Sequence, residues 1–76
     1  MACLPLTSLE TGMHGRVARI AAGHSATRRL YEMGFNTGAD VVVVKNDRGP
    51  VIVGLRGHKV ALGRGLAEKM LINTEQ

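Results

Sequence analysis

The side chains that could bind a metal ion are three histidines, one cysteine and a few carboxylates. His14, His24 and His58 are far apart in the chain, and Cys3 is the single cysteine. Zinc sites within one chain usually draw their ligands from short, regular spacings of Cys and His, which this sequence lacks. The three histidines are therefore weak candidates for metal ligands. We expect no required cofactor, although a divalent ion could be held between copies of the chain.

Motifs for catalysis are absent from the sequence. It has no phosphate-binding loop that ends in Gly-Lys-Ser or Gly-Lys-Thr, no Gly-x-Ser-x-Gly nucleophile turn and no paired-carboxylate motif. The short glycine-arginine stretch Gly63–Gly65 indicates a connecting turn. We therefore expect a protein that is not an enzyme.

The length of 76 residues indicates one small domain, covering residues 1–76. A lone cysteine excludes an internal disulfide and is typical of a reducing compartment. The N-terminus lacks the basic segment and apolar core of a signal peptide, and no apolar run approaches the length of a membrane span. We therefore expect a cytoplasmic protein.

The net charge of +4 suits a partner such as nucleic acid, an acidic protein or the inner leaflet of a membrane. Proteins that bind single strands stack bases on aromatic side chains, but Tyr31 and Phe35 are the only aromatic residues. Nucleic acid is therefore disfavoured. The same scarcity argues against the aromatic-lined grooves that bind proline-rich peptides.

A strand and then a helix open the pattern of elements that must position these side chains. Residues 15–20 indicate the strand. Ser25 is a candidate N-cap, and Ala26, Leu30 and Met33 then share one face of a helix that ends at Met33.

The end of this helix is well marked in the sequence. Gly34 can adopt the left-handed conformation that other residues resist, and Leu30 and Phe35 are spaced to make the hydrophobic contact of a Schellman ending. Residues 36–38, which end in Gly38, predict a further turn.

The run of four valines, Val41–Val44, predicts a strand that is apolar on both faces. One face must pack in the core, and the other must meet the helix, a second layer or another molecule. A homo-oligomer is therefore plausible on this face.

Two further strands and a closing segment follow the valine run. Residues 51–55 and 59–62 predict a hairpin whose two-residue loop is Gly57–His58, with Gly57 at the first position of a type II′ turn. Residues 66–72 predict a short helix and a last strand, and residues 73–76 a frayed tail.

Strands this short should curl into a barrel, because closure hides their edges. The sequence thus predicts a mainly β fold: a small SH3-like barrel of about five strands, with one short helix after the first strand and a second near the C-terminus.

The motifs in these elements resemble those of the FeoA family. They are Gly15-x-Val17-x-x-Ile20, Arg29-Leu30-x-Glu32-Met33-Gly34-Phe35-x-x-Gly38, Val41-x-Val43, Gly49-Pro50, Arg56-Gly57-x-x-Val60-Ala61-Leu62 and Ala67-Glu68-x-x-x-Ile72. The second block is the most specific, and the resemblance covers a core of about residues 6–72.

The resemblance implies an SH3-like fold and a non-enzymatic, cytosolic accessory or regulatory role in ferrous iron uptake. The implied partner is the cytosolic region of a FeoB-type ferrous iron permease, which carries a GTP-binding domain, so the protein would reach the inner face of the membrane through that partner. A similar domain lies at the C-terminus of iron-dependent repressors. A small basic nucleic-acid-binding barrel and a metal-binding or metal-sensing module stay open as alternatives.

The exposed basic residues are the candidates for contact with a partner, although most surface charges have no specific role. On the helix and the hairpin, the candidate partner-binding residues are Arg28, Arg29, Tyr31, Arg56, His58 and Lys59, and Arg64 is a further basic residue. The candidate structural residues are Gly15, Leu30, Met33, Gly34, Phe35, Gly38 and Gly57. The sequence does not show whether the helix and the hairpin lie side by side.

Overall fold

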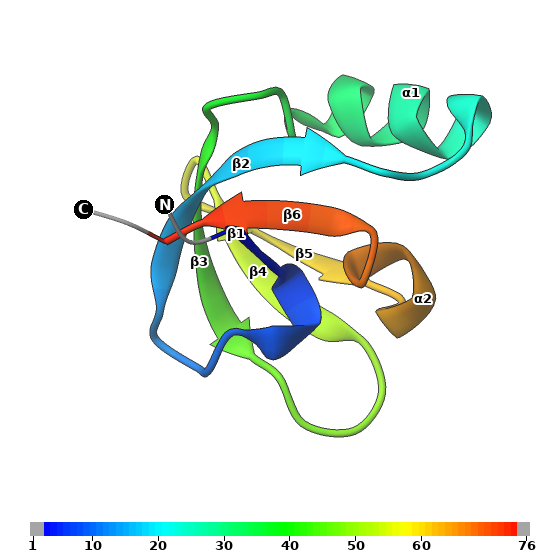
Figure 1. The fold of residues 1–76 in the computed structure, drawn as a ribbon. Helices are drawn as coiled ribbons and strands as arrows, with labels where there is room; N and C mark the ends of the chain where they lie inside the picture. Colours follow the sequence, from blue (N-terminus) through cyan, green and yellow to red (C-terminus); the bar gives the residue numbers. More distant parts are fainter. Residues whose placement is uncertain (1–2, 75–76) are drawn as a thin grey trace.

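Six strands form one curled antiparallel sheet in the order β1–β6–β2–β3–β4–β5 (Figure 1). The computed structural model describes residues 3–74. The strands are β1 (Cys3–Pro5), β2 (His14–Ile20), β3 (Asp40–Lys45), β4 (Val51–Leu55), β5 (His58–Leu62) and β6 (Met70–Asn73). The helices are the 3-10 turn η1 (Leu6–Ser8), α1 (His24–Met33) and α2 (Arg64–Ala67). The predicted fold class is confirmed, with six strands in place of about five.

The N-terminal strand β1 is the element that the sequence did not reveal. It has three residues, one of them Pro5, and pairs with β6 through Cys3 and Asn73 and through Leu4 and Ile72. A strand so short carries no readable alternation, and proline is confined to edge strands such as this one. The β6 strand runs through Asn73, so the predicted frayed tail is wrong at that residue, while residues 75–76 lie outside the described part of the chain.

The core lies on the concave side of the sheet. On β3, Val41 and Val43 are buried and Val42 and Val44 are half-buried, which confirms the alternation expected for a strand. Fully burying one such apolar side chain stabilises the fold by roughly 1.5–3 kcal/mol. The remaining buried apolar residues come from β2, β4, β5 and β6, from the helices and from the loops: Leu6, Leu9, Val17, Leu30, Phe35, Val51, Val53, Leu55, Leu62, Ala67, Met70 and Ile72.

The N-cap of helix α1 lies two residues earlier than predicted. Gly23 is the N-cap, in an extended conformation with no side-chain cap bond, so Ser25 lies within the first turn and the predicted cap is wrong. Thr27 holds this end instead, because its hydroxyl donates to the carbonyl oxygen of Ala22 at 3.2 Å. Across residues 3–74, no helix combines the length and apolar character needed to cross a membrane.

The other end of α1 has the Schellman geometry that the sequence predicts. Gly34 is left-handed, with φ of 110°, and its N–H donates to the carbonyl of Tyr31 at 3.0 Å. The N–H of Phe35 donates to the carbonyl of Leu30 at 3.0 Å, and both of these side chains are fully buried. Met33 differs from the prediction: it is 46% exposed, because the helix turns only the Leu30 side toward the core.

Gly15 is held by a close approach between strands β2 and β6. A Cβ atom at this position would collide with the side chain of Ile72 and lie 3.0 Å from the carbonyl oxygen of Asn73. Any larger residue would therefore push β6 away from β2, with which it pairs along residues 16–20.

A polar clamp fixes the loop between β3 and β4. Asn46 donates through its amide nitrogen to the carbonyls of Thr7 and Leu9, at 2.9 and 2.7 Å. Arg64 donates to the side-chain oxygen of Asn46 at 2.9 Å and to two carbonyls of the same loop at 2.8 and 3.3 Å. Arg64 is therefore a structural residue and no free part of a basic surface. It lies in α2, whereas the sequence predicts a connecting turn there.

Replacing Arg64 with alanine should lower the free energy of unfolding by about 1–3 kcal/mol, because Asn46 and the loop carbonyls lose a charged donor. Urea denaturation monitored by circular dichroism measures this change. Arg48→Ala is the matched control: Arg48 lies exposed in the same loop, and its removal should change stability by less than about 0.5 kcal/mol. Equal effects of the two substitutions would contradict the clamp.

Candidate functional site

The turn of the β4–β5 hairpin positions the cluster of exposed basic residues near its tip. Leu55 pairs with His58, so the two-residue loop is Arg56–Gly57 and the predicted loop Gly57–His58 is wrong. Both loop residues have positive φ, 54° for Arg56 and 82° for Gly57, which is the type I′ turn that matches the twist of a hairpin. The register of the strands, and not the position of the glycine, decides which residues form the turn.

Arg56 is the only non-glycine residue with positive φ within residues 3–74. The left-handed conformation costs an L-residue about 1–2 kcal/mol, and Asn or Gly is usual at this place. Strained residues of this kind concentrate at functional sites, so Arg56 is a candidate functional residue on geometric grounds.

A hollow near this turn lies on the face of the sheet opposite the core. We call it the outer groove; its volume is about 350 Å³, and β2, β3, β4, β5 and the hairpin turn contribute to it. The residues that define it are His14, Val42, Val44, Gly54, Arg56 and Lys59. His58 and Asp40 also line it.

Strand register explains why these residues meet. His14 on β2 pairs with Val42, Val42 pairs with Gly54, and Gly54 pairs with Lys59. These four residues form one row across four strands, on the face opposite the core. Gly54 lets Val42 pack over it: a Cβ atom there would lie 2.7 Å from a methyl carbon of Val42.

The floor of the outer groove is apolar and contains an irregularity. Val43 pairs with Val53, and the next pair joins Lys45 to Ile52, so Val44 is the extra residue of a β-bulge. Bulges redirect side chains and are common beside functional sites. Val42 and Val44 are half-buried and are not among the residues packed against the core.

The rim of the outer groove is basic. Arg56, His58 and Lys59 are exposed on the hairpin side, and His14 is exposed on β2. The acidic residue of the rim is Asp40, which forms an ion pair with the opposite residue Arg16 at 3.1 Å. The unbalanced charge that remains on the rim is positive.

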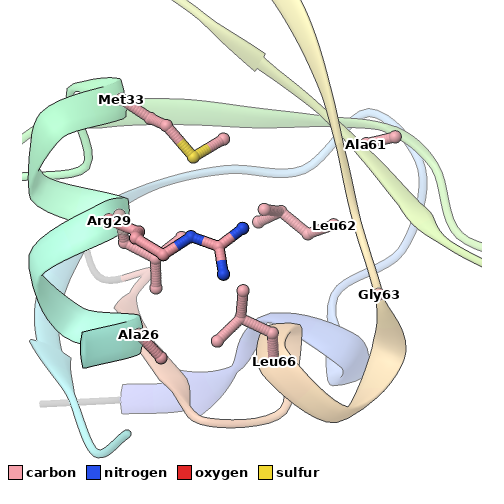
Figure 2. Close-up of a pocket in the computed structure, with 8 residues that line it drawn as sticks. Ala26, Arg29, Met33, Ala61, Leu62, Gly63 and Leu66 are labelled. Atoms are coloured by element: carbon pink, nitrogen blue, oxygen red, sulfur yellow. The ribbon is translucent and has the colours of Figure 1, made fainter. Parts of the chain in front are cut away.

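A second hollow, which we call the helix groove, lies between α1 and the β5–α2 segment and has a volume of about 260 Å³ (Figure 2). Arg29 and Met33 project into it from α1, and Leu62 and Leu66 face them from the other side. Figure 2 shows the guanidinium group of Arg29 reaching across the groove toward Leu62.

The six predicted partner-binding residues therefore separate into groups. Arg56, His58 and Lys59 line the outer groove, whereas Arg29 lines the helix groove. Arg28 and Tyr31 line neither. Arg28 forms an ion pair with Glu32 one turn along α1, at 3.7 Å, and Tyr31 is 44% exposed. Sequence reasoning missed Val42, Val44 and Gly54, although the apolar outer face of the valine run was a signal for the first two.

The three candidate metal ligands are not brought together. His14 and His58 line the outer groove, but His24 is the first residue of α1. Among the described residues, no group of three or more His, Cys, Asp or Glu side chains is arranged to hold a metal ion.

Comparison with known proteins places this arrangement in a family. The FeoA domain matches residues 4–74, which is nearly the whole chain. The chain belongs to the FeoA family. A Methanocaldococcus jannaschii relative of the Fe(2+) transport protein A type is 41% identical to this FeoA chain over 68 residues, covering 90% of this chain and 83% of the relative.

Solved FeoA structures have the same fold as this one. The crystal structure of an iron uptake regulatory protein, FeoA, is 33% identical, with a TM-score of 0.88 that covers 95% of this chain and 97% of that one. The solution structure of FeoA from Chlorobium tepidum is 26% identical, with a TM-score of 0.85 and coverage of 96% and 71%.

A manganese-dependent transcriptional repressor shares the fold of this FeoA chain at a TM-score of 0.87. It is 22% identical, and the match covers 96% of this chain but 42% of the repressor. The likeness confirms the SH3-like domain that these repressors share with FeoA proteins. At this identity it establishes the fold alone.

Replacing Arg56 with asparagine should raise the free energy of unfolding by about 0.5–1 kcal/mol, because asparagine tolerates the first position of a type I′ turn far better. Thermal and urea unfolding measure the change. Lys59→Asn is the matched control on the adjacent strand, where no left-handed residue is relieved, and it should bring no gain. A loss of stability in Arg56→Asn would show that the arginine side chain stabilises the turn.

Proposed function

We propose that this FeoA chain is a non-enzymatic accessory protein of ferrous iron uptake that binds the cytosolic region of a FeoB-type permease. Membership in the FeoA family over residues 4–74 carries the proposal, together with the 41% identity to a protein of the Fe(2+) transport protein A type. The permease would bring this chain from the cytoplasm to the inner face of the membrane.

The surface of the molecule supports a binding role. The outer groove and the helix groove both combine apolar side chains with basic ones. Apolar patches with polar rims are typical of protein contact sites. The basic groups on these grooves suit an acidic partner surface, since complementary potentials speed association and select partners.

The proposed function requires no resident metal ion. We propose that the chain folds and binds its partner without a resident ion, since no group of three or more His, Cys, Asp or Glu side chains within residues 3–74 is arranged to hold one. A second copy of the chain could supply the missing ligands, which would make any divalent ion an interface ion.

Calorimetric titration with the cytosolic region of the permease from the same organism tests the partner. We expect saturable binding with a Kd of about tens of micromolar or tighter, the range of transient complexes with a small interface. An unrelated small domain of the same net charge serves as the control for charge alone. Binding only to RNA or duplex DNA, with a steep dependence on salt, would support the nucleic-acid alternative and contradict the proposal.

Thermal unfolding with and without EDTA tests the metal requirement. The melting temperature should be unchanged by EDTA, because a bound ion would add to stability by mass action. A melting temperature that rises with Zn²⁺ or Fe²⁺ only at high protein concentration would indicate an ion between copies, and the His14→Asn/His58→Asn variant should abolish that rise. A fall on adding EDTA would contradict a metal-free fold.

A further inference from the structure

We infer that the outer groove docks an extended, acidic segment of the protein partner, with an apolar side chain seated on Val42 and Val44. This inference rests on the proposed function and assigns it to one face of the molecule. Of the two candidate surfaces, it assigns the contact with the partner to the hairpin side. The Arg28–Tyr31 side of α1 makes no contact in this assignment.

The first argument is the unpartnered apolar floor. Val42 and Val44 point away from the core, are half-buried, and are covered by no helix of the chain among the residues that line the groove. Gly54 shapes this floor, because methyl groups of Val42 and Val44 pack over it where a side chain would otherwise lie. An apolar side chain placed here would lose its contact with water, which is the main driving force for association.

The second argument is the spacing, along β3, of the residues that line the groove. Asp40, Val42 and Val44 all line the groove and alternate along one strand face. Residues two apart on a strand are separated by about 6.8 Å. A partner segment in an extended conformation has the same repeat, so its alternate side chains would meet the floor and the rim in register.

The third argument is charge complementarity. Arg56 and Lys59 flank the floor, His14 and His58 add further donors, and the acid on the rim is already paired with Arg16. An acidic segment would gain charge-assisted hydrogen bonds here. A second copy of the chain would instead bring basic rims together, and like charges oppose each other.

The shape of the groove argues against the other basic-surface ligands. A lipid surface is broad, so it would meet the raised hairpin residues and leave the recessed floor uncovered. A nucleic acid strand would need aromatic stacking partners, but Phe35 is buried and Tyr31 lies on α1, away from the groove.

Chemical-shift mapping of the labelled full chain with the permease's cytosolic region tests the assignment, together with calorimetric titration of three variants. Lys59→Glu and Val42→Asp should each weaken binding by about tenfold, a change of about 1.4 kcal/mol. Lys69→Glu, an exposed reversal near the far end of β2, is the matched control and should bind within about twofold of the wild type. Shifts should concentrate on the residues that line the outer groove.

The outcomes separate the two proposals. If the wild-type chain binds and both groove variants bind equally well, or if Lys69→Glu loses as much affinity as they do, the inference is wrong and the proposed function stands. If the wild-type chain does not bind, both are wrong. Lys59→Glu keeps the test valid should Val42→Asp fail to fold. Chemical shifts in the groove that are caused by phosphatidylserine vesicles or duplex DNA, but not by the permease, would overturn the inference in favour of those ligands. Shifts that grow with protein concentration alone would overturn it in favour of a second copy of the chain.

Discussion

Strand β3 buries one face in the core and turns its other apolar face away from the core. The positions of the core and of the outer groove both depend on this constraint. The strand lies between β2 and β4, so its backbone groups are satisfied on both edges. Val41 and Val43 form part of the concave core, while Val42 and Val44 cannot turn inward without a shift of register that would expose the other pair. The core and the outer groove are therefore the two sides of a single strand.

A domain this small is only marginally stable. Specific polar contacts hold its loops in place. Asn46 joins η1 to the β3–β4 loop, and Arg64 joins the same loop to α2. The Schellman ending of α1 does the same for the helix, since it seats Leu30 and Phe35 in the core while the chain reverses. These contacts tie the β3–β4 loop and the end of α1 to the rest of the fold.

The two grooves differ in what they offer a partner. The helix groove is apolar and is crossed by a single arginine, Arg29. The outer groove joins an apolar floor to a basic rim and carries the one strained non-glycine residue of the described chain, Arg56. The outer groove therefore suits a partner that is attracted by its positive charge and is bound through an apolar side chain.

The elements that were predicted correctly from the sequence are those whose signals are local. The ending of α1 at Gly34, the alternation of the valine run and the FeoA motifs all depend on residues close together in the chain. Tertiary structure decided what depends on register: the hairpin loop at Arg56–Gly57, the exposure of Met33, and the clamp by Arg64. It also decided which basic residues meet, because the row from His14 to Lys59 is assembled from four strands, and only strand pairing brings together residues so far apart in sequence.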